Sequence, residues 1–296
     1  MKVRKSKGFE TRRRRDLKGL FGEQALQRSG GMKRKGRGEA GEQLPVNRIG
    51  YLRAKGVPFY MKIQTRQLIT KLKRLGDPEI AVHSQRFFKT GKGEYTEGDK
   101  FLGIRVPDLR KCVKEYRDIP LENTLELLRT PFHEARLLAL FILVAKYSLK
   151  NNTEKGYIYK SYLSHTAYIN NWDLVDCSAE HIVGAHLFNG DKGPICRLAV
   201  SNSLWERRIA VMATFHFIKR NQFSDTLAIA GLLLKDPEDL IHKAVGWMLR
   251  EVGKRDLRAE ERFLVEFYRK MPRTMLRYAI EKLPETERKA YLHGTI

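Results

Sequence analysis

The chain has 296 residues, of which 42% are hydrophobic and 31% are charged, a composition typical of a globular protein rather than a disordered one. Its 57 Lys and Arg against 34 Asp and Glu give a net charge of +23, which favours a polyanionic partner, nucleic acid before an anionic membrane surface. The longest apolar run, residues 137–145, is too short to cross ~30 Å of hydrocarbon, which excludes a membrane-spanning helix.

The first 60 residues are strongly basic and poor in large apolar side chains. They include 12-RRRR-15 and 33-KRKGR-37, and they hold 17 basic and 5 acidic residues. Such a segment buries too little apolar surface to offset its ordering entropy, so residues 1–60 are predicted to be a disordered extension. This extension either binds phosphates without specificity or is merely solvated, and Met61 is an alternative start of the protein. The predicted domain, residues 61–296, still carries a net charge of +11.

Helical periodicity dominates the chain from residue 63 onward. Apolar residues recur at the i, i+3, i+4 and i+7 spacing of amphipathic helices, and short segments with Pro, Gly, Asn or Asp separate them. A long loop is predicted over residues 90–107, before a helix that starts at Pro107. No run alternates as a strand would, so the fold class is all-α. The clearest predicted helices cover residues 77–89, 133–147, 205–219 and 239–254.

Three stretches of the chain share a local sequence pattern. Arg208, Lys243 and Arg277 lie in the similar stretches RRIAV, HKAVG and LRYAI, 35 and 34 residues apart. A helix pair that recurs at about this period predicts an α-solenoid of HEAT-like helical repeats with a concave surface. The recurring basic residue then predicts a concave basic groove, although basic residues on helices are often simply solvated.

The stretch 168-YINNWDLVDC-177 places a tryptophan and two aspartates at the start of a predicted helix. Asn171 suits the N-cap, so the helix begins at Trp172. Asp173 then lies in the first turn, where a carboxylate is favourable to the helix dipole. Trp172 and Asp176 are four residues apart and share a face, which differs from the apolar face that the core would take.

A second tryptophan, Trp247, is four residues after Lys243 and shares its face, with core packing as the alternative role. Because successive repeats bring equivalent faces together, Trp172, Asp176, Arg208 and Trp247 are predicted to converge in the groove. A cationic groove holds a phosphate backbone, and aromatic faces pack on a sugar or base. A carboxylate there would stabilise positive charge that develops on deoxyribose and orient a water molecule. This set is what a DNA N-glycosylase needs.

Four stretches carry a resemblance to a known family: 101-FLGIRVPDLRK-111, 170-NNWDLVD-176, 204-LWERRIAV-211 and 242-HKAVGWMLREVGK-254. In this order they resemble the AlkD-like DNA alkylation repair family of HEAT-like DNA glycosylases, over about residues 61–293. The resemblance implies that Asp176 is the catalytic aspartate, that Trp172 and Trp247 flank the deoxyribose of the lesion, and that Arg208 contacts the DNA backbone.

The resemblance also implies the reaction. It is excision of positively charged N3- or N7-alkylated purines from duplex DNA by hydrolysis of the N-glycosidic bond, without base flipping. Lys243, Phe87 and Arg110 are further candidate DNA-binding residues, and Phe87 stands where some relatives have a tyrosine. The partner is duplex DNA with alkylated bases, and we expect a monomer.

No metal or other cofactor is expected. Cys112, Cys177 and Cys196 lack metal-ligand spacing and are too few for a disulfide framework, which suits a reducing compartment. His181 and His186 lie on different faces, with no Cys or carboxylate at ligand spacing. The basic N-terminus is not followed by the apolar segment of a secretory signal, so we expect a cytoplasmic, nucleoid-associated protein.

Two alternatives remain at this point. The first is a non-catalytic HEAT-repeat protein that binds branched or distorted DNA, and the complete set of acidic and aromatic residues argues against it. The second is a protein-binding solenoid, and the basic charge of the helical region argues against that.

Overall fold

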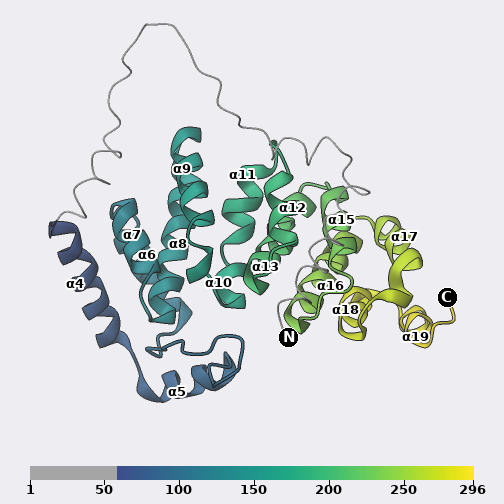
Figure 1. The fold of residues 1–296 in the computed structure, drawn as a ribbon, viewed down its shortest axis with the longest axis horizontal. Coiled ribbons are helices and arrows are strands. Elements are labelled where there is room, and N and C mark those ends of the chain that lie inside the picture. The colour runs from purple at the N-terminus through teal and green to yellow at the C-terminus, as the bar shows by residue number, and fades with distance from the viewer. Residues whose placement is uncertain (1–58) are drawn as a thin grey trace, which may run out of the picture. The chain divides into compact units, whose positions relative to one another are not determined.

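A computed structural model describes residues 59–296 (Figure 1). The predicted disordered extension lies outside the described residues except for residues 59 and 60, which begin a helix. The boundary predicted at residue 60 therefore stays a prediction. The chain divides into two compact units, one that ends at Lys146 and one from Tyr147 to Ile296, called here the N-terminal unit and the C-terminal unit.

The N-terminal unit consists of helices with short connections and one long loop. Asp77 caps the second helix, because its side chain accepts hydrogen bonds from the backbone N–H groups of Glu79 and Ile80. The described helices are α4 (Phe59–Leu75), α5 (Pro78–Phe87), α6 (Val106–Tyr116), α7 (Leu121–Leu128) and α8 (His133–Leu149), and α8 continues into the C-terminal unit.

The predicted long loop lies between α5 and α6, and Glu134 of α8 fixes its end. The buried Glu134 carboxylate accepts hydrogen bonds from the backbone N–H groups of Leu102, Gly103 and Ile104. Gly103 has φ of +80°, and a side chain there would overlap the carbonyl of Asp77. The stretch 101-FLGIRVP-107 thus has a packing role. Helix α6 begins at Val106, one residue earlier than predicted.

The C-terminal unit consists of helices, most of them short. They are α9 (Asn152–Leu163), α10 (Trp172–Asp176), α11 (Ala185–Leu187), α12 (Gly193–Ala199), α13 (Leu204–Ala213), α14 (Phe215–Ile218), α15 (Ser224–Leu232), α16 (Asp239–Gly253), α17 (Leu257–Phe267), α18 (Arg273–Ala279) and α19 (Glu285–His293). Three-residue 3₁₀ helices cover Thr166–Tyr168, Tyr268–Lys270 and Ile280–Lys282, and a π-helix covers Glu180–Gly184.

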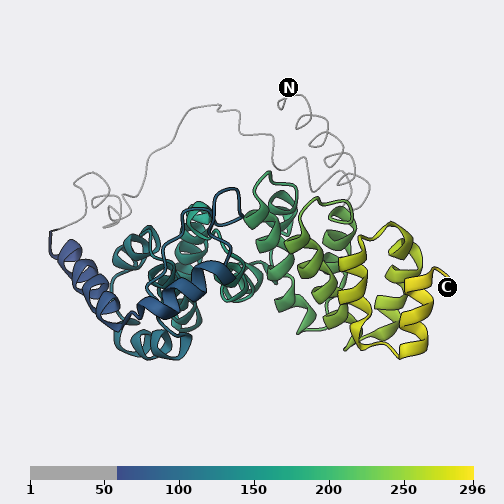
Figure 2. The ribbon, with the colours of Figure 1, turned by 90° about the horizontal axis from the view of Figure 1, so that it is seen from below.

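Within the C-terminal unit, α10, α13, α16 and α18 pack against one another in chain order (Figures 1 and 2). Two close contacts between backbones also occur in this unit, one from the π-helix to α13 and one from α16 to α18. A side chain at Gly184 would overlap the carbonyl of Ala213 on α13, and one at Gly246 would overlap the carbonyl of Met275 on α18. Both contacts join residues 29 positions apart.

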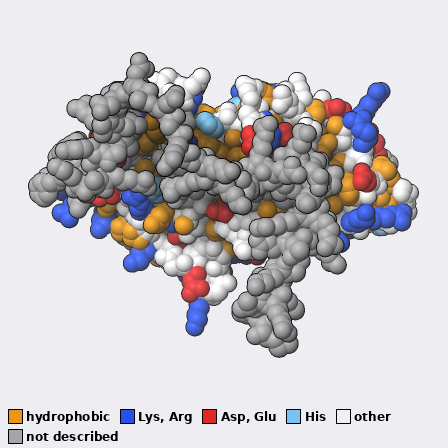
Figure 3. All heavy atoms as spheres, turned by 45° about the horizontal axis from the view of Figure 1, so that its top comes forward, with side chains coloured by type: hydrophobic (Ala, Val, Ile, Leu, Met, Phe, Trp, Pro, Cys, Tyr) orange, Lys and Arg blue, Asp and Glu red, His pale blue; other side chains and the backbone are white. Residues whose placement is uncertain are grey.

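The described residues are helical and contain no strand, which confirms the all-α prediction. One predicted helix is interrupted: residues 205–219 form α13 and α14, separated by Thr214, whose hydroxyl donates a hydrogen bond to the carbonyl of Val211. On the visible part of the face in Figure 3, Lys and Arg side chains occur in separate places beside acidic and apolar ones. The concave basic groove therefore stays a prediction.

Candidate active site

Helix α10 presents Trp172 at its first residue and Asp176 at its last. Asn171 is the N-cap, as predicted, and its side chain accepts a hydrogen bond from the Trp172 N–H. Leu174 and Val175 are fully buried and fix the helix to the core. Trp172 and Asp176, one turn apart, are each half-buried, so both remain accessible.

Arg208 of α13 holds Asp176 through two parallel hydrogen bonds. Its Nε donates to Asp176 Oδ1 and its Nη2 to Asp176 Oδ2, each at 2.8 Å. The remaining terminal nitrogen, Nη1, donates to the carbonyl oxygen of Leu240 in the first turn of α16 at 2.6 Å. The guanidinium thus fixes the position and orientation of the carboxylate, and it links α10, α13 and α16, which pack in that order.

The Asp176 carboxylate is enclosed but not sealed. Its side chain is 17% exposed, while that of Arg208 is 6% exposed. Burial raises the pKa of Asp176, and the charge and hydrogen bonds of Arg208 oppose that rise. A bidentate guanidinium binds the ionised carboxylate far better than the neutral acid, so the pair favours a negative Asp176 at neutral pH.

The preceding residue, Arg207, makes a second pair of the same kind. Its Nε and Nη2 donate to the two carboxylate oxygens of Asp236 at 2.7 and 3.2 Å. Its Nη1 donates to the backbone carbonyls of Ser201 and Asn202. The side chain of Asp236 is 0% exposed, so this pair is sealed inside the protein.

Trp247 lies on α16, half-buried, with its indole N–H donating to Glu251 Oε1 at 3.2 Å. The Trp247 ring is tilted against that of Phe215, with centroids 6.0 Å apart. Lys243, one turn before Trp247, makes an exposed ion pair with Asp239 at 2.7 Å. The structure therefore brings Asp176, Arg208 and the start of α16 together, and places Lys243 and Trp247 further along that helix.

Phe87 and Arg110 belong to the N-terminal unit. Phe87 is the last residue of α5, 59% exposed, and its ring meets the edge of Phe88 at 5.0 Å between centroids. Arg110 is exposed on α6, with its guanidinium 5.8 Å from the centre of the Phe141 ring. Their DNA-binding roles stay predictions.

Comparisons with known proteins bear on the family and the fold of the chain. A family model described as DNA alkylation repair enzyme matches residues 68–283. The chain belongs to the DNA alkylation repair enzyme family. A solved structure of a protein described as a predicted DNA alkylation repair enzyme from Enterococcus faecalis has a TM-score of 0.54 and 19% identity, covering 71% of this chain and 97% of that chain. That likeness supports the fold alone. No curated protein matches the chain.

In this family member, sequence reasoning missed two features beside the site. Glu251 is buried and accepts from both the Trp247 indole and Lys254, at 3.2 and 2.6 Å. Its spacing of four residues from Trp247 is the available signal, since the two share a helix face. The sealed pair of Arg207 with Asp236 was missed because its partners are 29 residues apart and meet only through tertiary packing.

Two searches of the described residues bear on other kinds of site. No group of three or more His, Cys, Asp or Glu in residues 59–296 is arranged to hold a metal ion. No helix in the same range is long and apolar enough to cross a membrane. The Asp176–Arg208 pair combines a carboxylate fixed by two hydrogen bonds with partial exposure of that carboxylate.

Proposed function

We propose that this protein is a monofunctional DNA glycosylase that excises positively charged N3- and N7-alkylated purines from duplex DNA. The observation that supports this most is the Asp176 carboxylate, fixed by a buried bidentate arginine and still 17% exposed. A family of DNA alkylation repair enzymes makes alkylated DNA the substrate to test. The protein would act on DNA as a monomer, in the cytoplasm or nucleoid.

The leaving base supplies much of the driving force. When the bond between C1′ and the base nitrogen breaks, its electron pair neutralises the cationic alkylpurine. Positive charge is left on the deoxyribose, and a nearby carboxylate stabilises such a transition state. Water then attacks C1′ and loses a proton to the carboxylate or to solvent. No nucleophilic lysine and no extrusion of the base into a pocket are required, which fits a reaction without base flipping.

The two hydrogen bonds from Arg208 leave acceptor capacity on Asp176. Each carboxylate oxygen has two lone-pair directions, and Arg208 takes one on each oxygen. The other directions are available to orient a water molecule or to face the sugar. Because the guanidinium holds the carboxylate rigidly, little reorganisation is needed as charge develops on the sugar. Trp172 and Trp247 would pack against the deoxyribose on either side, as the family resemblance implies.

The test is incubation with methylated duplex DNA, followed by chromatographic identification of free N7-methylguanine and N3-methyladenine. The wild-type protein is expected to release both bases. Asp176→Asn is expected to lose release while its affinity for unmodified DNA is kept or improved, because a negative charge has been removed. Release by this variant at the wild-type rate would contradict the proposal.

A second candidate is a non-catalytic helical-repeat protein that binds branched or distorted DNA. The Arg207–Asp236 pair favours this candidate. It is a bidentate arginine–aspartate pair whose carboxylate is completely buried, and the Asp176–Arg208 pair could likewise serve only to hold helices together. This candidate predicts salt-dependent binding to branched DNA with no base released from any alkylated substrate. The same incubation decides between the two.

A further inference from the structure

The net charge of the chain is distributed very unevenly among its folded parts. Residues 61–75 hold five basic residues and no acidic one. Residues 76–146 hold 12 basic and 11 acidic residues, and residues 147–296 hold 23 and 18. A single helix, α4 (Phe59–Leu75), thus contributes a net charge of +5, as much as the whole C-terminal unit. The basic character predicted for the domain is concentrated on this helix.

One face of α4 packs against the rest of the N-terminal unit, so the opposite face points away from that unit. Leu68 and Leu72 are buried, and α4 packs on α7. Thr65 donates a hydrogen bond to Glu126 at 2.7 Å and accepts one from Asn123 at 3.0 Å. The opposite face of α4 is therefore held toward solvent.

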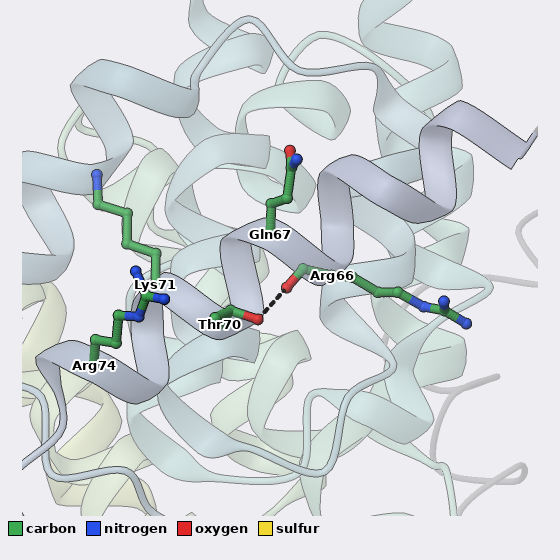
Figure 4. Close-up of a pocket in the computed structure, with 5 residues that line it drawn as sticks. All are labelled: Arg66, Gln67, Thr70, Lys71 and Arg74. Atoms are coloured by element: carbon green, nitrogen blue, oxygen red, sulfur yellow. Dashed lines mark hydrogen bonds between the residues drawn. The ribbon is translucent and has the colours of Figure 1, made fainter.

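That outer face is an open hollow lined by Arg66, Gln67, Thr70, Lys71 and Arg74, called here the α4 basic face (Figure 4). Arg66, Thr70 and Arg74 are exposed and recur every four residues, so they form one row about 12 Å long. Lys71 is already paired with Glu115 at 2.5 Å. Arg66 and Arg74 are in no ion pair with another described residue and stand at the two ends of the hollow.

We propose that the α4 basic face is a docking surface for the phosphate backbone of duplex DNA, distinct from Asp176 and its partners. A phosphate backbone offers one charge per roughly 3.4 Å of each strand, so a row of this length faces several phosphates. Arginine suits this ligand, because its planar fork donates two parallel hydrogen bonds to a phosphate. The surface supplies affinity without reading sequence. The inference rests on the proposed function only in taking duplex DNA as the ligand.

The experiment measures binding of the full chain to a short unmodified duplex at a series of NaCl concentrations. Arg66→Gln/Arg74→Gln is compared with the wild type. Each phosphate contact contributes about 0.9 to the slope of log affinity against log salt, so the slope is expected to fall by about 1.8. Both residues are exposed, and thermal unfolding checks that the variant is folded.

Helix α17 provides a matched control. Its exposed Arg258 and Arg262 also line an open hollow on one helix face, four residues apart where Arg66 and Arg74 are eight apart, but they share α17 with three acidic residues. Arg258→Gln/Arg262→Gln removes the same charge from the chain and is expected to leave the salt slope at the wild-type value. An equal fall in both variants would mean that only net charge matters, and would overturn the proposal.

An unchanged salt slope in the α4 variant would also overturn the proposal. So would unchanged DNA binding together with weaker binding to poly-glutamate, because that result would make an acidic protein the partner of this surface. Because unmodified DNA is used, this result is independent of base release. If the α4 variant loses slope while the wild type releases no base, the docking surface stands and the glycosylase proposal fails.

Discussion

Arg207 and Arg208 are neighbours on α13, and each holds an aspartate through two hydrogen bonds. Both guanidinium groups are equally buried, with 6% of each side chain exposed. The carboxylates differ: Asp236 is completely sealed, whereas 17% of Asp176 is exposed. A sealed pair contributes only to the fold, while an open pair has acceptor lone pairs that a substrate can reach. Two adjacent arginines thus hold one aspartate that no substrate can reach and one that a substrate can reach.

The largest expected effect tests the open pair. In Asp176→Asn the amide cannot stabilise positive charge on the sugar, so the rate of base release is expected to fall roughly 10²–10³-fold or more. Single-turnover release of N7-methylguanine from methylated duplex DNA measures this. Rates are compared per folded molecule, because the variant also weakens a half-buried ion pair. A loss of less than tenfold would remove the distinction between the two pairs.

The same substitution in the sealed pair is the matched control. Asp236→Asn leaves the buried Arg207 charge without its full partner, which is expected to cost about 3–5 kcal/mol of unfolding free energy. Urea denaturation measures that loss. Base release per folded molecule is expected to stay close to wild type, and a parallel collapse of activity would show that the sealed pair also serves the chemistry.

A third buried carboxyl, Glu260 of α17, lacks a bidentate arginine. It lies against Gly253, and its Oε1 has no hydrogen-bond partner among the described residues. Burial, helped by Glu261 and opposed by Arg250, raises the pKa of Glu260 to about 8. Its folded-state pKa exceeds the unfolded value, so its contribution to stability is complete below about pH 4.5 and is lost as the pH rises toward about 8.

Glu260→Gln is therefore expected to remove that decline and to stabilise the protein at pH 8 by about 2 kcal/mol. This is less than the full pKa shift implies, because the buried amide would itself lack partners. Thermal unfolding between pH 5 and about 8 measures the slope. If the wild type and the variant lose stability in parallel over this range, Glu260 is already ionised in the folded protein.

A milder change in the open pair is Arg208→Lys, which keeps the charge and loses one of the two hydrogen bonds to Asp176. One charge-assisted hydrogen bond is worth about 1.5 kcal/mol, so roughly a tenfold loss in rate is expected. Because Arg208 opposes the rise in the pKa of Asp176, the acidic limb of the pH–rate profile should move to higher pH. A lower rate with an unshifted limb would assign Arg208 to DNA contact instead.

The smallest expected effect concerns Lys243, whose ion pair with Asp239 is exposed on both sides. Lys243→Gln is expected to change the unfolding free energy by about 0.5 kcal/mol or less. If Lys243 contacts a phosphate, the salt slope for DNA binding falls by about 0.9. An unchanged slope would remove Lys243 from the DNA-binding residues.

Local features of the fold were predictable from sequence because they depend on neighbouring residues. The Asn171 cap, the long loop before α6 and the helix over residues 239–253 all follow from capping chemistry and apolar spacing. The π-helix Glu180–Gly184 was not predicted, since a π-turn has no distinct apolar period. The break at Thr214 was also missed, because neither Pro nor Gly marks it.

The residues of the candidate site were predictable from the sequence, but the ion pair between Asp176 and Arg208 was not. The sequence placed Trp172 and Asp176 on one face of a helix, which the structure confirms for α10. The family resemblance also implied that Arg208 contacts DNA, which stays a prediction; in the structure its side chain is buried and bonded to Asp176 and Leu240. The two ion-paired residues are 32 positions apart, so only the stacking of α10 on α13 reveals the bond.

The close contacts at Gly184 and Gly246 have a consequence for how such proteins diverge. Where two helices meet backbone to backbone, their separation is set by main-chain atoms and not by the size of interlocking side chains. Substitutions elsewhere on these helices then leave the distance between the two helices unchanged. Because backbone atoms set the spacing of the helices, most side chains elsewhere can be substituted, which accords with a shared fold at 19% identity.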